Sequence, residues 1–216
     1  MKTEINFKPW VGEKYLSEGF KGKRILVLGE SHYCPKELAE GGRCFPLCKK
    51  ENMKKECVSQ TEDIIGDFVG GYNGESYMQT YLCFERAIYG KPLSQDERAY
   101  FWDRIVYYNY VQYALPAART SPTSEQWLLS ESAFKEMLEK YMPDYIIVWG
   151  ARLYKALPAL DGVGSDFSIN ESDKTEVWTY TINSKKIPAL KVYHPSSPCG
   201  KSWPYWHEFY KKFLGI

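Results

Sequence analysis

The sequence has no surplus of charge of either sign and no long apolar run. Its 28 lysine and arginine residues balance 27 aspartate and glutamate residues, which gives a net charge of +1. Proteins that track many phosphates usually have a basic surplus, so any nucleic-acid contact here must be local. No stretch reaches the length of a membrane span, and residues 1–10 lack the apolar run of a signal peptide. We therefore expect a soluble, cytoplasmic protein that does not bind membranes.

Internal repeats, low-complexity tracts and flexible linkers are also missing from the sequence. A chain of 216 residues can bury one sizeable core, so we expect a single domain over residues 1–216. The aromatic share is high at 16%, with 18 tyrosines and 7 tryptophans. Most of these rings should fill the core, but tyrosine and tryptophan also suit stacking pockets because they combine an apolar body with a polar group.

Six cysteines in a reducing compartment favour thiols or metal ligands over disulfides. Cys34, Cys44, Cys48 and Cys57 fall in a segment rich in glycine, proline and charge, which we interpret as a loop insertion over about residues 34–57. Four thiolates at such spacing can surround a zinc ion or an iron–sulfur cluster. We favour structural zinc over a cluster, and free thiols without any metal are the alternative.

Short apolar runs alternate with amphipathic segments along the chain. Buried strands are predicted at residues 24–29, 104–112, 144–149 and 187–193, with a half-buried strand at 176–182. Helices are predicted at residues 61–69, 76–88, 94–102, 124–141, 150–157 and 203–214, and residues 161–173 are predicted to form a polar surface excursion. This alternation predicts a three-layer α/β/α fold with a central four-stranded parallel sheet.

Polar motifs follow three of the predicted core strands. They are GESHY at residues 29–33, Asn109 with Gln112, and HPSSP at residues 194–198. Ligands of parallel sheets bind outside the carboxyl ends of the strands, and these ends meet at one edge. The sequence therefore predicts a single site built from these three motifs.

The three motifs, in this order, resemble the uracil-DNA glycosylase superfamily. Its members have a glycine and an acidic or polar residue after the first strand and His-Pro-Ser after the last, as here at residues 29–30 and 194–196. The middle of the chain is similar to the iron–sulfur branch. It has a strand ending in Asn109, a loop with Arg, Pro and Glu at residues 119–125, and a Pro-Asp strand closed by Gly-Ala at residues 143–151. Each motif alone is weak, but together they extend over nearly the whole chain.

This resemblance implies hydrolysis of the N-glycosidic bond that joins a nucleobase to its sugar, as in DNA base-excision repair. His194 and Glu30 would be catalytic: His194 would hydrogen-bond a carbonyl oxygen of the departing base, and Glu30 would orient water or stabilise the sugar cation. Asn109 would read the edge of the base. The remaining base-pocket residues would be Gly29, Ser31, His32, Tyr33, Phe45 and Ser196, and the nucleic-acid contacts would be Ser197 and Lys201.

The chain departs from the family pattern in two places. His32 and Tyr33 stand where the iron–sulfur branch has Pro-Gly and the best-known branch has Pro-Tyr-His. Ser197 and the residues after it supply no apolar wedge to fill the gap of an extruded base. These departures leave open which base, if any, is the substrate.

Two other functions are compatible with the sequence. One is a non-catalytic module on the same fold that binds a nucleobase or nucleic acid. The other is a hydrolase built on His32, Glu30 and a loop metal, which is less favoured because no nucleophile motif accompanies the pair. We expect the partner to be nucleic acid, bound by local contacts in single strands, or a nucleotide-like small molecule, and we expect a monomer.

Overall fold

A computed structural model describes residues 4–34, 55–71, 74–196 and 201–216. The four predicted core strands are present and mutually parallel, in the order β4-β2-β6-β9. They are β2 (Ile25–Gly29), β4 (Ile105–Asn109), β6 (Tyr145–Trp149) and β9 (Lys185–Val192). Nearly all residues of β2, β4 and β6 are buried, which explains their unbroken apolar runs.

The prediction of a four-stranded parallel sheet is nevertheless wrong, because the sheet in the described part of the chain has seven strands and is mixed. Three antiparallel strands extend the parallel centre. β1 (Trp10–Val11) pairs with β4, β8 (Lys174–Ile182) pairs with β9, and β7 (Val163–Ser168) pairs with β8. A separate two-stranded sheet joins β3 (His32–Tyr33) to β5 (Ala114–Leu115).

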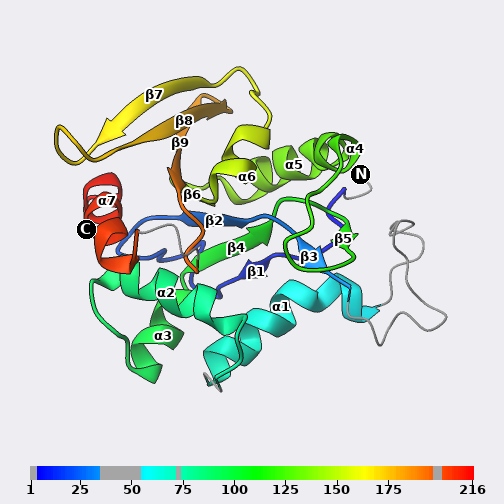
Figure 1. Cartoon of the computed structure of the whole chain (residues 1–216), viewed down its shortest axis with the longest axis horizontal. Coiled ribbons are helices and arrows are strands. Elements are labelled where there is room, and N and C mark those ends of the chain that lie inside the picture. Colours follow the sequence, from blue (N-terminus) through cyan, green and yellow to red (C-terminus); the bar gives the residue numbers. More distant parts are fainter. Residues whose placement is uncertain (1–3, 35–54, 72–73, 197–200) are drawn as a thin grey trace.

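Helices cover both faces of the sheet, which gives the expected layers (Figure 1). The first core cluster, which includes Val27 and Ile147, packs against α1 (Lys55–Gly70), α2 (Met78–Tyr89), α3 (Gln95–Trp102) and α7 (Trp203–Leu214). The second core cluster, which includes Leu28 and Val148, packs against α5 (Glu131–Tyr141) and α6 (Ala151–Ala156). Successive strand residues point to opposite faces, so each strand contributes to both clusters.

The predicted helix over residues 124–141 is two helices, α4 (Ser124–Leu129) and α5, which meet at Ser130. The buried Ser130 hydroxyl donates to the Gln126 carbonyl at 2.7 Å and accepts from the Gln112 backbone N–H at 3.0 Å. The Ser130 hydroxyl therefore binds a backbone group that is distant in sequence. The amphipathic pattern of residues 124–141 does not reveal that the helix is interrupted at Ser130.

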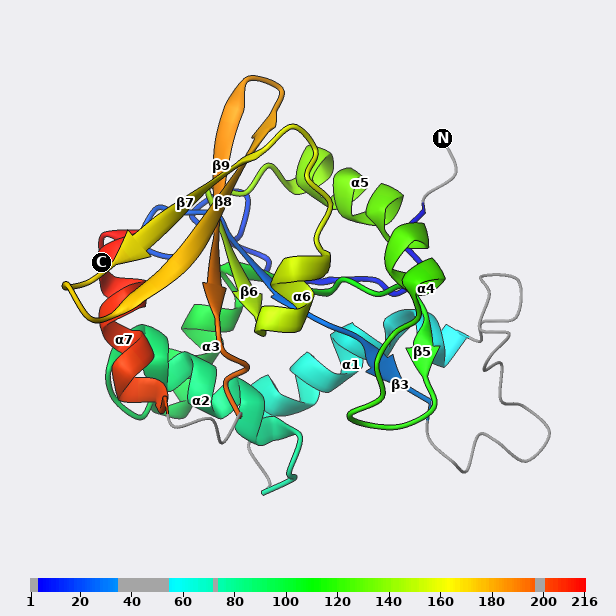
Figure 2. The ribbon, with the colours of Figure 1, turned by 45° about the horizontal axis from the view of Figure 1, so that its top comes forward.

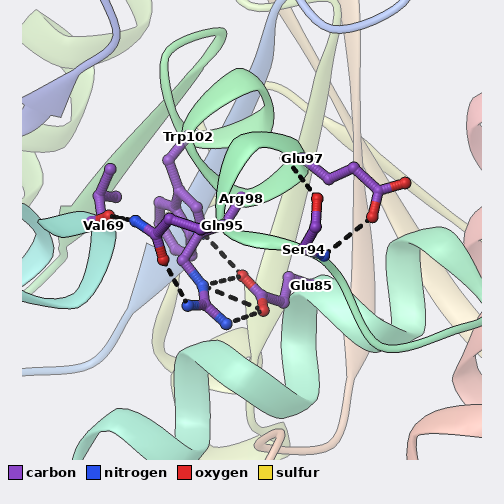
Figure 3. A network of polar contacts seen from close by, with 7 residues as sticks. All are labelled: Val69, Glu85, Ser94, Gln95, Glu97, Arg98 and Trp102. Atoms are coloured by element: carbon purple, nitrogen blue, oxygen red, sulfur yellow. Dashed lines mark hydrogen bonds and ion pairs between the residues drawn. The ribbon is translucent and has the colours of Figure 1, made fainter. Parts of the chain in front are cut away.

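Helices α1, α2 and α3 are joined by a buried polar network (Figure 3). The Arg98 guanidinium forms three hydrogen bonds of 2.8–3.2 Å to the two carboxylate oxygens of Glu85, which is fully buried. Gln95 accepts from Arg98 at 3.2 Å and donates to the Val69 carbonyl of α1. This network fixes the helices on which part of the candidate site stands.

Several predicted features fall outside the described residues: Cys44, Phe45, Cys48 and Ser197. Cys34 directly follows β3, whereas Cys57 lies within α1 and therefore not in a loop. None of the helices in the described ranges combines the length and apolar character that a membrane crossing demands.

Candidate functional site

The carboxyl ends of the parallel strands bring two of the three polar motifs into direct contact. The chain leaving β4 remains bonded to the chain leaving β2, because the N–H groups of Tyr110 and Val111 donate to the carbonyls of Gly29 and Glu30 at 3.0 and 2.8 Å. The third motif follows β9, whose last residue accepts from the Gly150 N–H at 2.9 Å. Glu30, Asn109 and His194 therefore lie at the same edge of the sheet.

Gly29 forms the floor of this edge. A Cβ atom on Gly29 would lie 2.2 Å from both the Asn109 Oδ1 atom and the Tyr107 hydroxyl, which is far inside contact distance. The Tyr107 hydroxyl donates to Asn109 Oδ1 at 3.1 Å in the space left by the missing side chain. Close packing of these two side chains therefore requires glycine at this position.

His32 is buried beside Asn109 and is held neutral. Its Nε2 atom lies 2.9 Å from the Thr61 hydroxyl and 3.2 Å from Asn109 Nδ2, and its ring packs against Phe7 with 4.4 Å between centroids. Burial lowers the pKa of His32 to about 3, and only 3% of the residue is exposed. His32 therefore supports the Asn109 amide, and no hydrogen bond joins its ring to Glu30 in the described part of the chain.

Glu30 is bound by an arginine that the sequence did not single out. Arg152, in the first turn of α6, donates from Nε to Glu30 Oε2 at 2.8 Å and from a second nitrogen to Oε1. Its third nitrogen donates to the Ser121 hydroxyl at 2.6 Å, in the loop before α4. The hydrogen bonds to Glu30 raise the pKa of Arg152. The candidate carboxylate is therefore held by a two-point ion pair.

His194 joins the site through a chain of hydroxyl groups. Thr80 on α2 donates to the Ser196 hydroxyl at 3.1 Å, and this hydroxyl lies 3.1 Å from His194 Nδ1 (Figure 2 shows the chain after β9 reaching α2). The Trp149 ring lies edge-on to the imidazole, 6.2 Å between centroids. The residue is exposed overall, but protein atoms crowd its ring, and this desolvation lowers the pKa of His194 against the opposing effect of Glu30.

Two further predicted pocket residues lie beside Glu30 in sequence. About 40% of Tyr33 is exposed. The Ser31 hydroxyl is enclosed and has no hydrogen-bond partner among the described residues. Tyr33 is therefore available to a ligand at the rim, whereas Ser31 points into the protein.

Lys201, the predicted phosphate contact, is already engaged. Its ammonium group lies 3.6 Å from an Asp173 carboxylate oxygen and 3.7 Å from the centre of the Tyr205 ring. It lines a cavity of about 220 Å³ between the β7–β8 pair and α7, together with Tyr193 and Trp206. Lys201 therefore has its contacts in a cavity that neither Glu30 nor Arg152 lines.

The metal prediction depends on residues that are only partly described. Cys34 and Cys57 both pack against a small apolar cluster of Phe7 and Ala114. The described ranges contain no group of three or more cysteine, histidine, aspartate or glutamate side chains that could hold a metal ion. Zinc or a cluster on the four cysteines remains a prediction.

Arg152, Ser121 and Thr80 belong to the site but were not predicted from the sequence. Arg152 had one available signal, because it stands two residues after Gly150, at the carboxyl end of a predicted core strand and in the first turn of a predicted helix. Its partner Glu30 is 122 positions away, and no local pattern connects the two. Thr80 likewise meets Ser196 across 116 positions.

No protein-family model matches the chain, and a search of curated proteins finds no match. The resemblance to the uracil-DNA glycosylase superfamily therefore depends on the order of the motifs in the sequence.

Proposed function

We propose that this protein hydrolyses the N-glycosidic bond between a nucleobase and its sugar, in the manner of uracil-DNA glycosylases. The observation that carries the proposal is the placement of a carboxylate and an imidazole, Glu30 and His194, after two parallel strands at the carboxyl edge of one sheet. The reaction passes through a positively charged sugar and a negatively charged base. These two side chains suit the two opposite charges.

His194 suits the negative charge on the departing base. Because the Ser196 hydroxyl accepts from Thr80, it can donate its own hydrogen to His194 Nδ1, which leaves the proton of the neutral imidazole on Nε2. Desolvation favours this neutral form, because it lowers the pKa of His194. Nε2–H then donates to a carbonyl oxygen of the base as charge develops there.

Glu30 suits the positive charge on the sugar. When the C1′–N bond breaks, its electron pair leaves with the base. The oxygen of a water molecule then bonds to C1′, and the proton released by that water neutralises the base. A carboxylate beside C1′ stabilises the cation and orients the water. Arg152 holds Glu30 in position in the free protein.

A binding module without catalysis is the second candidate, and it is favoured because Arg152 occupies both carboxylate oxygens of Glu30. The Asn109 amide is engaged as well, since its oxygen accepts from Tyr107 and its nitrogen faces His32. Only 6% of Asn109 is exposed, so the side chain predicted to read the base is largely committed to the protein interior. A protein that only holds a base needs neither a free Glu30 nor a water molecule beside it.

The experiment that separates the two candidates measures abasic sites in oligonucleotides. Single-stranded and duplex substrates that contain uracil, hypoxanthine, xanthine or mismatched thymine are incubated with the purified protein and with the His194→Ala variant. We expect abasic product from at least one base, with a rate reduced about 100- to 1,000-fold in His194→Ala because a donor to the developing anion is lost.

The circular dichroism spectrum and the unfolding midpoint of His194→Ala are measured as a control for folding. Both should match those of the wild type. Unchanged cleavage in a folded His194→Ala variant would remove the role of His194. Tight binding of a base-containing oligonucleotide without any abasic product would replace the proposed reaction by the binding function.

A further inference from the structure

The two members of the Glu30–Arg152 pair differ in their exposure to solvent. About 48% of the Arg152 side chain is exposed, against 15% of the Glu30 side chain. A ligand that enters from solvent therefore meets the guanidinium before it meets the carboxylate. Ion pairs that are open to water are weak, because solvent competes for both charges and the long side chain keeps its freedom.

This pair conflicts with the role proposed for Glu30. Nε and a second nitrogen of Arg152 occupy both carboxylate oxygens, and the guanidinium cancels the negative charge of the carboxylate. A neutralised carboxylate gives little stabilisation to a sugar cation. Glu30 can act at full strength only when Arg152 has moved to another acceptor.

A phosphate group is the acceptor that fits the exposed guanidinium. The planar fork of an arginine matches two oxygens of a phosphate as well as it matches a carboxylate. In a nucleotide or a nucleic-acid strand, phosphate is attached to the sugar whose bond is cleaved. Lys201, the other cation considered at this edge, is turned to Asp173 and Tyr205.

We propose that Arg152 recognises a phosphate attached to the scissile sugar, and that this contact withdraws it from Glu30 and so activates the site. The inference rests on the proposed glycosidic cleavage and names its substrate class, a phosphate-bearing nucleotide or strand in preference to a free nucleoside. Arg152 is here a specificity-determining residue, and Ser121 supports its starting position with a 2.6 Å hydrogen bond.

The first test compares the kcat/KM of a short single-stranded oligonucleotide with that of the matching 2′-deoxynucleoside. The wild type should prefer the oligonucleotide, and Arg152→Gln should reduce this preference roughly ten- to hundredfold, because a charge-assisted contact is lost. Cleavage of the nucleoside should be maintained or increased, since Glu30 is released from its partner. Arg152→Lys, which keeps the charge but loses the fork, should give an intermediate preference.

Lys155→Gln is the matched control, because it removes one positive charge from an exposed position of the same helix. Lys155→Gln should prefer the oligonucleotide over the nucleoside by the same factor as the wild type. A purely structural role of Arg152 predicts that Arg152→Gln lowers both rates by the same factor, and an unchanged preference in Arg152→Gln overturns the inference.

A second test does not depend on cleavage. The Arg152 Nε–H resonance is followed by NMR during titration with inorganic phosphate, with an abasic single-stranded oligonucleotide and with a deoxynucleoside. We expect the two phosphate-bearing probes to shift this resonance and the nucleoside to leave it in place. No shift with either phosphate-bearing probe overturns the inference. A shift in a protein that cleaves no substrate would retain phosphate recognition while the proposed reaction fails.

Discussion

Two of the protein's arginine–carboxylate pairs, Arg98–Glu85 and Arg152–Glu30, have the same chemistry but opposite surroundings. In the core, Glu85 is fully buried, 8% of the Arg98 side chain is exposed, and Gln95 and Trp102 complete the network. At the edge of the sheet, Arg152 is about half exposed and Glu30 is its partner. In both pairs, two guanidinium nitrogens contact the two oxygens of one carboxylate. Only the surroundings differ.

This difference in burial predicts that loss of one partner has a different cost in the two pairs. Removal of one partner of a buried pair leaves an uncompensated charge in a medium that cannot solvate it. The pKa of the Glu85 carboxyl reflects this competition, since burial raises it while Arg98 and Trp102 lower it. At the exposed pair water replaces a lost partner, so the pair can exchange with a ligand at small cost.

Arg98→Ala should therefore have the largest effect on stability. We expect a loss of about 3–5 kcal/mol in the free energy of unfolding, because Glu85 would remain buried without its cation. The matched variant Arg152→Ala should cost at most about 1 kcal/mol. Urea denaturation followed by circular dichroism measures both. Equal losses in the two variants would refute the contrast between the pairs.

His32 is a single buried titratable group, and its burial predicts that the free energy of unfolding depends on pH. Its pKa is about 3 in the folded protein and about 6.5 in the unfolded chain, so only the unfolded chain binds the proton between these values. The stabilising contribution of neutral His32 is complete above pH 6.5 and is lost as the pH falls towards 3, by about 1.4 kcal/mol per pH unit.

Unfolding free energies measured from pH 7 to pH 4 test this prediction in the wild type and in His32→Gln. The unfolding free energy of His32→Gln should depend less steeply on pH, because unfolding of the variant takes up about one proton fewer. Its unfolding free energy at pH 7 should also be lower than that of the wild type. His194 contributes in the same direction, since its pKa is lowered too, so a His194→Ala background isolates the effect of His32. An identical slope with and without His32 would contradict the account.

Gly29→Ala should have a smaller effect on stability and a large effect on the site. The new methyl group would meet the Asn109 amide oxygen and the Tyr107 hydroxyl, and overpacking of this kind costs about 1–3 kcal/mol. Gly22→Ala is a control, because a Cβ at Gly22 meets no atom within 4 Å, although its positive φ adds some strain. A Gly29→Ala variant as stable as the wild type would show that the floor of the site is not tightly packed.

Sequence periodicity was sufficient to predict the helices and strands whose burial is recorded in a local pattern of apolar residues. Strand β6 and helix α7 were found because an apolar run and an amphipathic stripe each record burial directly. The helix predicted over residues 94–102 is present as α3, and Ser94 caps it in a capping box with Glu97. Strand β7 was missed because it is an edge strand with mostly exposed residues, so burial leaves no alternating pattern in it.

The candidate site was predictable at the level of the strand ends but not at the level of contacts. Glu30 and His194 were placed at one edge because the carboxyl ends of parallel strands meet there. Arg152 was missed because its ion pair with Glu30 spans 122 positions, and nothing in the sequence near Arg152 indicates where its side chain turns. The commitment of Asn109 to Tyr107 and His32 likewise depends on tertiary packing.

The most direct measurement of the central claim is single-turnover cleavage by Glu30→Gln of whichever base-containing oligonucleotide the wild type cleaves. Glu171→Gln, the same exchange at an exposed position outside the site, is the matched control. We expect a rate lowered by at least about 100-fold in Glu30→Gln, with oligonucleotide binding retained and with wild-type cleavage in the control. Cleavage by Glu30→Gln at the wild-type rate would contradict this expectation, because the carboxylate at the edge of the sheet would then take no part in the reaction.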